Sequence, residues 1–539
     1  MKKIVCILLS LIMVFSVTAN SAAVSENGTD TPIIIIPGFL QTALFLEKEN
    51  GKKEQVWLPD LMKGLPIIEK NLPEVLTSLF GVFLDNPEAF GKSLMKTMSD
   101  LMPMMKCNPD GTSVYPVTHY ENDPAKRNLS AIKKNKDIKM QAYYTFAEYI
   151  CENEYADFHN VFFFEYDGRM DVISISEELR QFIKDVKDYT KKDKVRLFGV
   201  SYGGQIAEAY LHFYMNDFDV EKAVFNVPSW KGTNFADRIL RGTVEVAFDD
   251  IMDIVESISC SDTEFNKLLK DVDMTCISRI LNGISEGIAE YAKHWSSVYS
   301  LTDEENYEAL KETFLDPTES AEIIRRNDIV HYEIMPNIKE TLEKCIASGI
   351  DVAIQASSGI ELSMGGTKNS DLLLAVEDVT GAKAAVMGER FKNGYRGAKT
   401  TCSNDGHYHI SPSMEIDAST AFLPENTWFL DGSHHAMFQY ERYGAELNAK
   451  LLCTDELKDI YSSSEFPQFM CSTNPHRGVW AGFNNSTSGY VTVADTKLTV
   501  ENLYRNNDIK ITCVKAQGMD IKFDLKKPIT LKPGEKAEI

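Results

Sequence analysis

The feature that most constrains this chain is a serine placed between two glycines, where a strand-like run meets a helix-like run. The pentapeptide Gly199-Val200-Ser201-Tyr202-Gly203 follows the apolar segment 195–198 and precedes the helix-forming segment 205–211. A strand, Gly-x-Ser-x-Gly and a helix in this order form a nucleophile elbow, a sharp turn that exposes the serine hydroxyl. The glycines leave room for the turn, because a Cβ there would collide with neighbouring backbone. This context predicts that Ser201 is a nucleophile.

Apolar runs of the same kind recur along the 539 residues, separated by segments with the periodicity of amphipathic helices. They lie at residues 33–36, 160–166, 194–200, 222–227, 351–356 and 427–430. Continuous apolar strands that alternate with helices are typical of a parallel sheet covered on both faces. The chain is also longer than a single ordinary core requires. We therefore expect an α/β fold with further insertions or domains.

Three stretches depart from this alternation. Residues 61 to about 106 and 232 to about 340 have helical periodicity, the first rich in Leu and Met and the second acidic. They are either ordinary packing helices or a cap over Ser201, whose adaptable methionines would receive an apolar acyl chain. Residues 474–539 instead alternate short strands with turns. We expect a main domain over residues 24–473 and a small, sandwich-like C-terminal β module, a candidate for binding a surface or a glycan.

The amino terminus predicts secretion. Lys2 and Lys3 precede an apolar stretch over residues 4–17, and small polar residues then lead to a cut expected near Ala23. This is the pattern of a signal peptide over residues 1–23, and its apolar run is shorter than the ~20 residues that a membrane span needs. Loss of its two lysines would lower the formal charge from -23 to -25. So acidic a chain does not bind nucleic acid through its overall field.

The cysteines and histidines indicate neither a disulfide framework nor a metal site. Ten cysteines are scattered without a Cys-x-x-Cys pair, and nine remain after removal of Cys6. His407 and His409 are two residues apart with no further His or Cys nearby. We assign them to the rim of a substrate site and expect no metal and no cofactor.

A serine nucleophile needs a base and an orienting carboxylate, which in this architecture follow it in the order acid, then His. The base is expected in the loop after strand 427–430, where His434 and His435 are adjacent. We favour His435, which falls three residues after Gly432, the spacing of related enzymes. For the acid we favour Asp405, because an Asp-Gly turn can present a carboxylate from a tight loop. The competing acids are Asp371, Asp378, Asp417 and Asp431.

An oxyanion formed at the substrate carbonyl needs backbone N–H donors. The residue after the nucleophile supplies one, and the loop after an early strand supplies the other. We expect these donors to be Tyr202 and Phe39, the latter in the turn Pro37-Gly38-Phe39-Leu40.

With these residues in order, the chain resembles the α/β-hydrolase branch that contains lecithin:cholesterol acyltransferase and its bacterial lipase-like relatives. The matching pieces run in family order over about residues 30–450: Ile33–Phe39, Trp57-Leu58-Pro59, Glu165–Arg169, the elbow, Asn404-Asp405-Gly406 and Gly432–His435. The resemblance implies that the insertion after Phe39 engages lipid surfaces and that Trp57 and Leu40 contact substrate. Gly168 stands where the family usually has Trp, and His407-Tyr408-His409 follows the acid where a helix usually starts, so the substrate stays open.

The sequence therefore predicts a secreted serine hydrolase that cleaves or transfers acyl groups of carboxylic esters. Its expected partner is a lipid or other acyl ester at a membrane or micelle surface. Two alternatives remain at this point: a serine peptidase or amidase with the same triad, and a non-catalytic secreted binding protein on the same scaffold.

Overall fold

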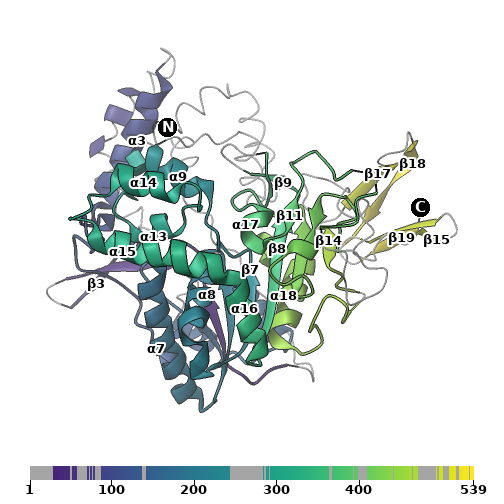
Figure 1. The fold of residues 1–539 in the computed structure, drawn as a ribbon, viewed down its shortest axis with the longest axis horizontal. Helices are drawn as coiled ribbons and strands as arrows, with labels where there is room; N and C mark the ends of the chain where they lie inside the picture. Colours follow the sequence, from purple (N-terminus) through teal and green to yellow (C-terminus); the bar gives the residue numbers. More distant parts are fainter. Residues whose placement is uncertain are drawn as a thin grey trace.

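A computed structural model gives the fold of the chain (Figure 1). The structure describes residues 28–48, 51–57, 70–71, 73–75, 77–78, 86–135, 141–242, 283, 287–289, 292–362, 367–392, 394–398, 409–440, 442–463, 465–471, 493–494, 497–501, 509–516, 521–532 and 535–538. The predicted signal peptide lies outside these residues.

A seven-stranded sheet forms the centre, in the order β14-β13-β8-β7-β6-β1-β5, and every neighbouring pair is parallel. Its strands are β1 (Ile33–Ile36), β5 (Val161–Phe163), β6 (Val195–Val200), β7 (Val220–Asn226), β8 (Asp351–Ser358), β13 (Thr427–Asp431) and β14 (Phe469–Cys471). The six strands expected from apolar runs are confirmed, and β14 is an additional edge strand. The parallel arrangement places the carboxyl ends of all seven strands at one edge, where ligands bind in open α/β sheets.

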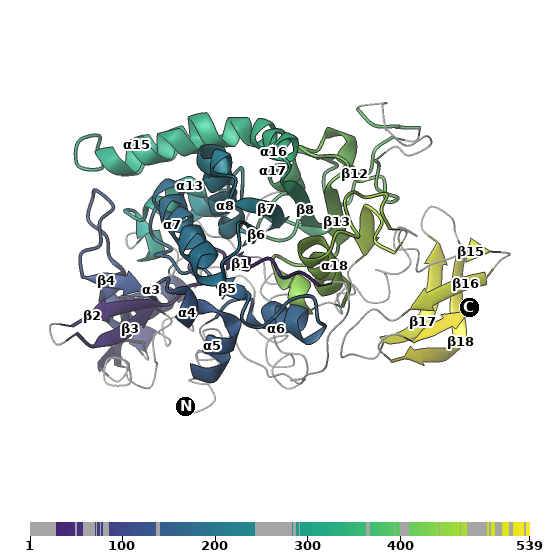
Figure 2. The same cartoon turned by 90° about the horizontal axis from the view of Figure 1, so that it is seen from below.

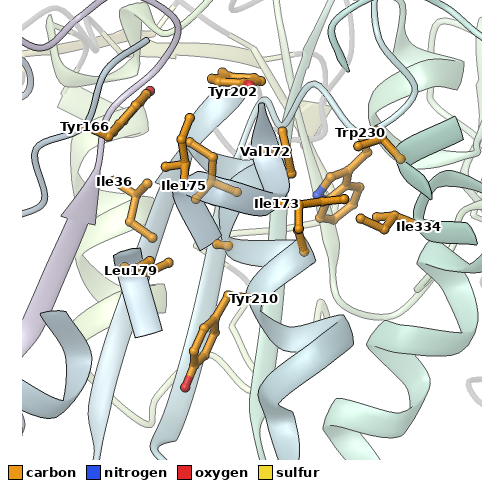
Figure 3. Packing of buried hydrophobic residues seen from close by; sticks show 14 of the residues in the cluster. Ile36, Tyr166, Val172, Ile173, Ile175, Leu179, Tyr202, Tyr210, Trp230 and Ile334 are labelled. Atoms are coloured by element: carbon orange, nitrogen blue, oxygen red, sulfur yellow. The ribbon is translucent and has the colours of Figure 1, made fainter. Parts of the chain in front are cut away.

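Side chains of alternate strand residues enter two separate cores, one on each face of the sheet. Ile34 and Ile36 pack with helices α7 (Val172–Thr190), α8 (Tyr202–Tyr214) and α16 (Ile338–Ala347), as Figure 3 shows in part. Ile33 and Ile35 pack with α5 (Leu129–Asn135), α6 (Tyr144–Glu152) and α18 (Arg442–Cys453). Figure 2 shows these two helical layers on opposite sides of the sheet. The predicted α/β class is confirmed, and the layering fits the α/β-hydrolase fold.

Both predicted insertions are helical where the structure describes them. The first contains α3 (Pro87–Leu101) and η1 (Pro103–Met105). The second contains α9 (Asn234–Arg241), α13 (Ser296–Ser300), α14 (Tyr307–Phe314), α15 (Ala321–Ile329), η4 (Val330–Ile334) and η5 (Met335–Asn337). The two insertions touch each other, because a Cβ on Gly287 would lie 2.4 Å from Cγ of Met95. Met95, Met102 and Met105 are buried, so these methionines act as packing residues.

Shorter elements complete the main domain. The segment after β1 forms an antiparallel sheet of β3 (Lys53–Trp57), β2 (Leu44–Glu47) and β4 (Val117–His119), which the sequence did not predict. Beyond it lie α4 (Pro124–Arg127) and η3 (Met215–Asp217). The segment after β8 contains β9 (Ile360–Glu361), β10 (Asn369–Ser370), α17 (Val376–Thr380), β11 (Lys383–Ala384), β12 (Ile416–Asp417) and η6 (Ala418–Thr420), and η7 (Met437–Tyr440) precedes α18.

The carboxyl-terminal residues form short strands, as their alternating pattern predicts. They are β15 (Val493–Ala494), β16 (Lys497–Glu501), β17 (Ile509–Ala516), β18 (Ile521–Leu531) and β19 (Lys536–Glu538). Strand β16 pairs with β15 and β19, and β17 pairs with β18, all antiparallel. That they form an independent module stays a prediction.

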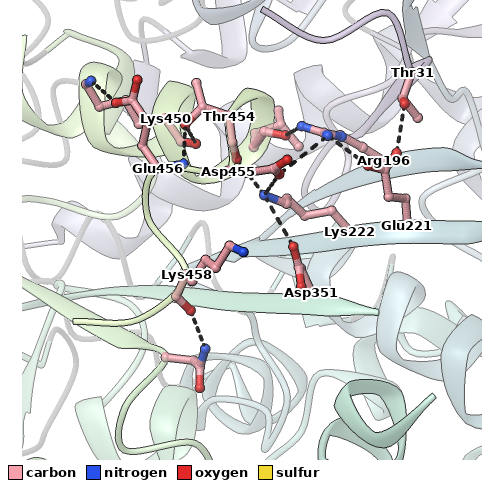
Figure 4. A network of polar contacts seen from close by, with 12 residues as sticks. Thr31, Arg196, Glu221, Lys222, Asp351, Lys450, Thr454, Asp455, Glu456 and Lys458 are labelled. Atoms are coloured by element: carbon pink, nitrogen blue, oxygen red, sulfur yellow. Dashed lines mark hydrogen bonds and ion pairs between the residues drawn. The ribbon is translucent and has the colours of Figure 1, made fainter. Parts of the chain in front are cut away.

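Two buried cations near the amino ends of β6 and β7, Arg196 and Lys222, bind the carboxyl end of α18 (Figure 4). Arg196 of β6 donates to the Leu452 carbonyl at 3.0 Å and to the Glu221 carboxylate at 2.9 Å. Lys222 of β7 donates to the Thr454 carbonyl at 2.6 Å. Cations at a helix carboxyl terminus satisfy its last carbonyls and its dipole. The network therefore fixes the end of α18 against β6 and β7.

The structure also bears on membrane insertion. Among the described residues, none of the helices combines the length and the apolar character needed to cross a bilayer.

Candidate active site

Ser201 lies in a strained turn at the carboxyl end of β6. Its backbone has φ 55° and ψ -121°, directly before the first residue of α8. A positive φ is unfavourable for serine and persists only where neighbouring contacts fix it. The Ser201 N–H donates to the Asn226 carbonyl at 3.0 Å, and its carbonyl accepts from the Ser229 N–H at 3.1 Å. These bonds from the β7 end hold the serine in the turn.

The start of α8 presses against the end of β1, which explains the second glycine of the elbow. A Cβ on Gly203 would lie 2.1 Å from the Ile36 carbonyl oxygen and 2.5 Å from that of Pro37. No side chain fits there, since such contacts lie far inside van der Waals separation. The nucleophile turn and the loop after β1 are thus in direct contact.

His435 reaches Ser201 from the loop that follows β13. Its Nε2 lies 2.9 Å from the Ser201 Oγ, and its Nδ1 lies 2.7 Å from Oδ2 of Asp371. Its backbone N–H donates to the Asp371 carbonyl at 2.8 Å. The structure therefore brings together Ser201 and His435, the residue favoured over His434, whose side chain is buried beside this loop.

The carboxylate that contacts the imidazole belongs to Asp371, one of the acids that compete with the favoured Asp405 in the sequence. Asp371 is fully buried after β10, and its Oδ1 accepts from the backbone N–H groups of Leu373 at 3.0 Å and Leu374 at 2.8 Å. Asp405 lies outside the described residues. The sequence favours Asp405 because an Asp-Gly turn can present a carboxylate by itself. Asp371 is instead held in a turn that its own side chain closes, through hydrogen bonds to the two backbone N–H groups. One signal could have found it: Asp371 is the first aspartate after β8.

This arrangement determines the protonation of the imidazole. An ionised carboxylate only accepts hydrogen bonds, so Nδ1 of His435 must carry the proton that it donates to Asp371. Nε2 is then free to accept the proton of the Ser201 hydroxyl. A base oriented by a third group and within reach of a serine hydroxyl is the geometry of nucleophilic catalysis.

The loop after β1 passes next to Ser201, as expected for the second N–H donor. A Cβ on Gly38 would lie 3.2 Å from Cβ of Ser201. The next residue, Phe39, places its ring edge-on to the Tyr202 ring, with centroids 6.0 Å apart. Tyr202 is the first residue of α8, where a backbone N–H has no acceptor within its own helix. Both predicted oxyanion donors are thus beside the serine.

Leu40 and Trp57, the predicted substrate contacts, are bonded to each other. The Trp57 indole N–H donates to the Leu40 carbonyl at 2.7 Å, and both side chains pack against the core at partial burial. The Leu40 backbone has φ 54° and lies close to Gly168. A Cβ on Gly168 would lie 2.9 Å from the Leu40 nitrogen. A side chain at position 168 would therefore collide with the loop after β1, which explains the glycine there.

Asp167 and Arg169 of the same segment have a structural role. Arg169 is fully buried and pairs with Asp167 at 2.6 Å. It also donates to the Met104 carbonyl at 3.2 Å and to the Ser113 hydroxyl at 3.1 Å. Arg169 thereby ties the end of β5 to the first insertion.

The two histidines expected at the rim of the substrate site are His407 and His409. His407 lies outside the described residues. His409 is buried, with its Nδ1 2.9 Å from the Gln468 side-chain oxygen and its Nε2 3.3 Å from the Tyr461 hydroxyl. Gln468 in turn donates to the Thr427 carbonyl at the amino end of β13. His409 is therefore packed at the amino ends of β13 and β14, whereas Ser201 lies at the carboxyl end of β6, and the prediction that His409 lines a substrate rim is wrong. Within the ranges that the structure describes, groups of three or more possible metal ligands are absent.

Comparisons with known proteins find similarity only among solved structures. No protein-family model matches the chain, and no curated protein matches it. Phospholipase PlaB from Legionella pneumophila in complex with thio-NAD aligns at a TM-score of 0.23 and 12% identity, over 41% of this chain and 35% of that chain. A second structure of PlaB aligns at 0.22 and 11%, over 48% and 42%. The Tle4–Tli4 complex aligns at 0.26 and 12%, over 61% and 75%. The chain thus spans less than half of PlaB, and alignments this weak assign it no activity.

Proposed function

We propose that this chain is a serine hydrolase that cleaves carboxylic esters, with Ser201 as nucleophile, His435 as general base and Asp371 as the orienting carboxylate. The observation that carries the proposal is the continuous hydrogen-bond chain from Ser201 Oγ through both imidazole nitrogens to Asp371 Oδ2. Its members come from three loops at the carboxyl edge of the sheet, and Ser201 has the strained backbone of a nucleophile elbow.

The reaction follows from these positions. As the Ser201 oxygen bonds to the ester carbonyl carbon, its proton passes to Nε2 of His435, and the carbonyl oxygen becomes an oxyanion bound by the N–H groups of Phe39 and Tyr202. His435 then gives the proton to the departing alcohol, which leaves an acyl group on Ser201. Water attacks this acyl-enzyme by the same steps and releases the carboxylic acid and the free serine. An alcohol in place of water would make the same site a transferase.

The proposed substrate is a lipid or other long-chain acyl ester met outside the cytoplasm. The resemblance to the lecithin:cholesterol acyltransferase branch supports an acyl substrate, and the amino-terminal pattern of residues 1–23 supports export. We call the turn Pro37-Gly38-Phe39-Leu40 the oxyanion turn. The hydrogen bond between Trp57 and Leu40 supports a role for Trp57 in substrate contact, because it holds an aromatic residue beside this turn.

Covalent labelling tests the nucleophile. A fluorophosphonate probe should label the wild-type protein, and Ser201→Ala should lose both labelling and ester turnover. Ser176→Ala is a matched control, because Ser176 is a buried serine on α7 that donates to the Ile173 carbonyl at 2.7 Å. It should label like the wild type. Undiminished labelling of a folded Ser201→Ala protein would overturn the proposal.

Substrate panels separate ester hydrolysis from the peptidase or amidase alternative. p-Nitrophenyl esters of increasing acyl length and peptide anilides are assayed in parallel with wild type and Ser201→Ala. The proposal expects Ser201-dependent turnover of esters that improves with chain length. Turnover of anilides at rates comparable to esters would favour the alternative.

A further inference from the structure

The peptide group between Gly38 and Phe39 is held by hydrogen bonds to its carbonyl. The Tyr166 hydroxyl lies 2.7 Å from the Gly38 carbonyl oxygen and 2.7 Å from that of Pro37. The Gln41 N–H also donates to the Gly38 carbonyl, at 3.2 Å. The single Tyr166 proton is shared between the two carbonyls. Together with the Gln41 N–H, it holds the carbonyl of the peptide group whose N–H belongs to Phe39.

The Gly38 N–H, in contrast, is already used. It donates to the side-chain oxygen of Gln41 at 2.8 Å. The Leu40 nitrogen lies against Gly168, where a Cβ would be 2.9 Å away. Phe39 is therefore the residue of this turn expected to supply an N–H to a substrate. In a planar trans peptide group the carbonyl and the N–H point in opposite directions. Whatever fixes the Gly38 carbonyl therefore also fixes the direction of the Phe39 N–H.

The Tyr166 side chain is well placed for such a role. It is fully buried at the end of β5, and Figure 3 shows it with Tyr202 at the same end of the apolar cluster. Its own carbonyl accepts from the Thr42 hydroxyl at 2.5 Å, which ties the loop after β1 to it a second time. Burial raises the pKa of the Tyr166 hydroxyl well above its usual value, so this group keeps the proton that it donates.

We infer that Tyr166 is a positioning residue of the oxyanion site: its hydroxyl holds the Gly38–Phe39 peptide group so that the Phe39 N–H faces the oxyanion on the Ser201 adduct. The inference rests on the proposed function. It gives a role to the tyrosine of the Glu165–Arg169 segment, which the motif match alone does not explain. A hydrogen bond to the carbonyl also polarises the peptide group and strengthens its N–H as a donor.

The test is Tyr166→Phe, which removes one oxygen and keeps the buried ring. Loss of a whole oxyanion donor costs about 10²–10³ in kcat, and here the donor remains but loses its support, so we expect kcat to fall about 10- to 100-fold. KM should stay within about threefold, because the donor acts on the transition state. Affinity for a trifluoromethyl ketone, which forms a tetrahedral adduct with the serine, should fall by the same factor as kcat. The pH profile of kcat/KM should not change, because the substitution leaves the hydrogen bonds of His435 in place.

Tyr299→Phe is the matched control. Tyr299 is equally buried, and its hydroxyl donates to the Lys293 carbonyl at 2.8 Å, away from the loop after β1. It should match Tyr166→Phe in thermal stability while keeping wild-type kcat. If Tyr166→Phe does not fold, Gln41→Ala tests the adjoining Pro37–Gly38 peptide group, whose carbonyl the Tyr166 hydroxyl contacts and whose N–H donates to the half-buried Gln41 side chain. It should lower kcat at constant KM.

The outcomes separate the inference from the proposed function. A wild-type protein without ester turnover or probe labelling means that the proposed function has failed. An active wild type with Tyr166→Phe at unchanged kcat and unchanged ketone affinity overturns the inference alone. A loss that appears equally in Tyr299→Phe, or only in KM, also overturns it, because either result indicates a general effect on packing or binding.

Discussion

The assignment of Asp371 as the orienting carboxylate is best tested by Asp371→Asn. In the structure Oδ1 accepts two backbone N–H groups and Oδ2 faces Nδ1 of His435 at 2.7 Å. In asparagine the oxygen must remain on the two N–H groups, so the NH₂ takes the place of Oδ2. This NH₂ can only donate, and it would force the imidazole proton from Nδ1 to Nε2. His435 could then no longer accept the Ser201 proton.

The size of the effect follows from this change of tautomer. The same exchange in a serine protease triad lowers kcat about 10⁴-fold at intact geometry, and we expect a loss of about 10³–10⁴-fold here. The turn closed by Oδ1 is retained, so the free energy of unfolding should change by less than about 1 kcal/mol, within the range of mild substitutions. The assay is kcat on a p-nitrophenyl ester, with urea unfolding in parallel.

Asp405→Asn is the natural comparison, since the sequence favours that residue. It should retain kcat within about threefold, the range of a substitution outside a triad. If Asp405→Asn abolished turnover while Asp371→Asn left it near wild type, the reasoning from the observed hydrogen bonds would be refuted.

Two further predictions concern a buried histidine and the loop after β1. His331 is buried and stacked on Tyr307 at 3.7 Å between centroids, and burial lowers its pKa from 6.5 to about 4. Because the folded state disfavours its protonation, stability is full above pH 6.5 and falls by up to about 3 kcal/mol as the pH drops toward 4. Urea unfolding at pH 7 and pH 4.5 should show a smaller pH effect in His331→Phe, and an identical effect would contradict this. Gly168→Ala would place a Cβ 2.9 Å from the Leu40 nitrogen and displace the oxyanion turn, so kcat on p-nitrophenyl esters should fall about 10-fold or more. Wild-type kcat in Gly168→Ala would show that the turn tolerates the shift.

The sequence revealed the parts of the fold that carry strong local patterns. Buried parallel strands are continuous apolar runs, so six of the seven central strands could be recognised. The three-residue β14 and the polar β3 (Lys-Glu-Gln-Val-Trp) were missed, because short edge strands have too few residues for a pattern. In the small sheet, β2 and β3 are neighbours in sequence, but β4 pairs with β2 from a segment far along the chain.

The candidate site was predictable to a similar degree. Ser201 lies in a motif with its own backbone geometry, and His435 lies just beyond a recognisable strand. Asp371 could not be selected over Asp405 by local turn chemistry, because its position depends on how the loop after β8 folds back onto His435. The role inferred for Tyr166 depends on a contact between the segment after β5 and the loop after the neighbouring strand β1. No sequence pattern predicts this contact.

The cation network at the far end of the sheet has a consequence for how such a chain can diverge. Ser201 directly follows strand β6, which carries Arg196 near its start. Helix α18 follows the His435 loop, and the carbonyls at its carboxyl end accept from Arg196 and Lys222. Ser201 and His435 are thus linked at both ends of the strands: by their own hydrogen bond at the carboxyl ends, and through β6 and α18 at the amino ends. Neither link includes a residue of the two helical insertions. We therefore expect substitutions in the insertions to leave the separation of Ser201 and His435 unchanged. In the proposed hydrolase, these parts of the chain can diverge while the chemistry of the site is retained.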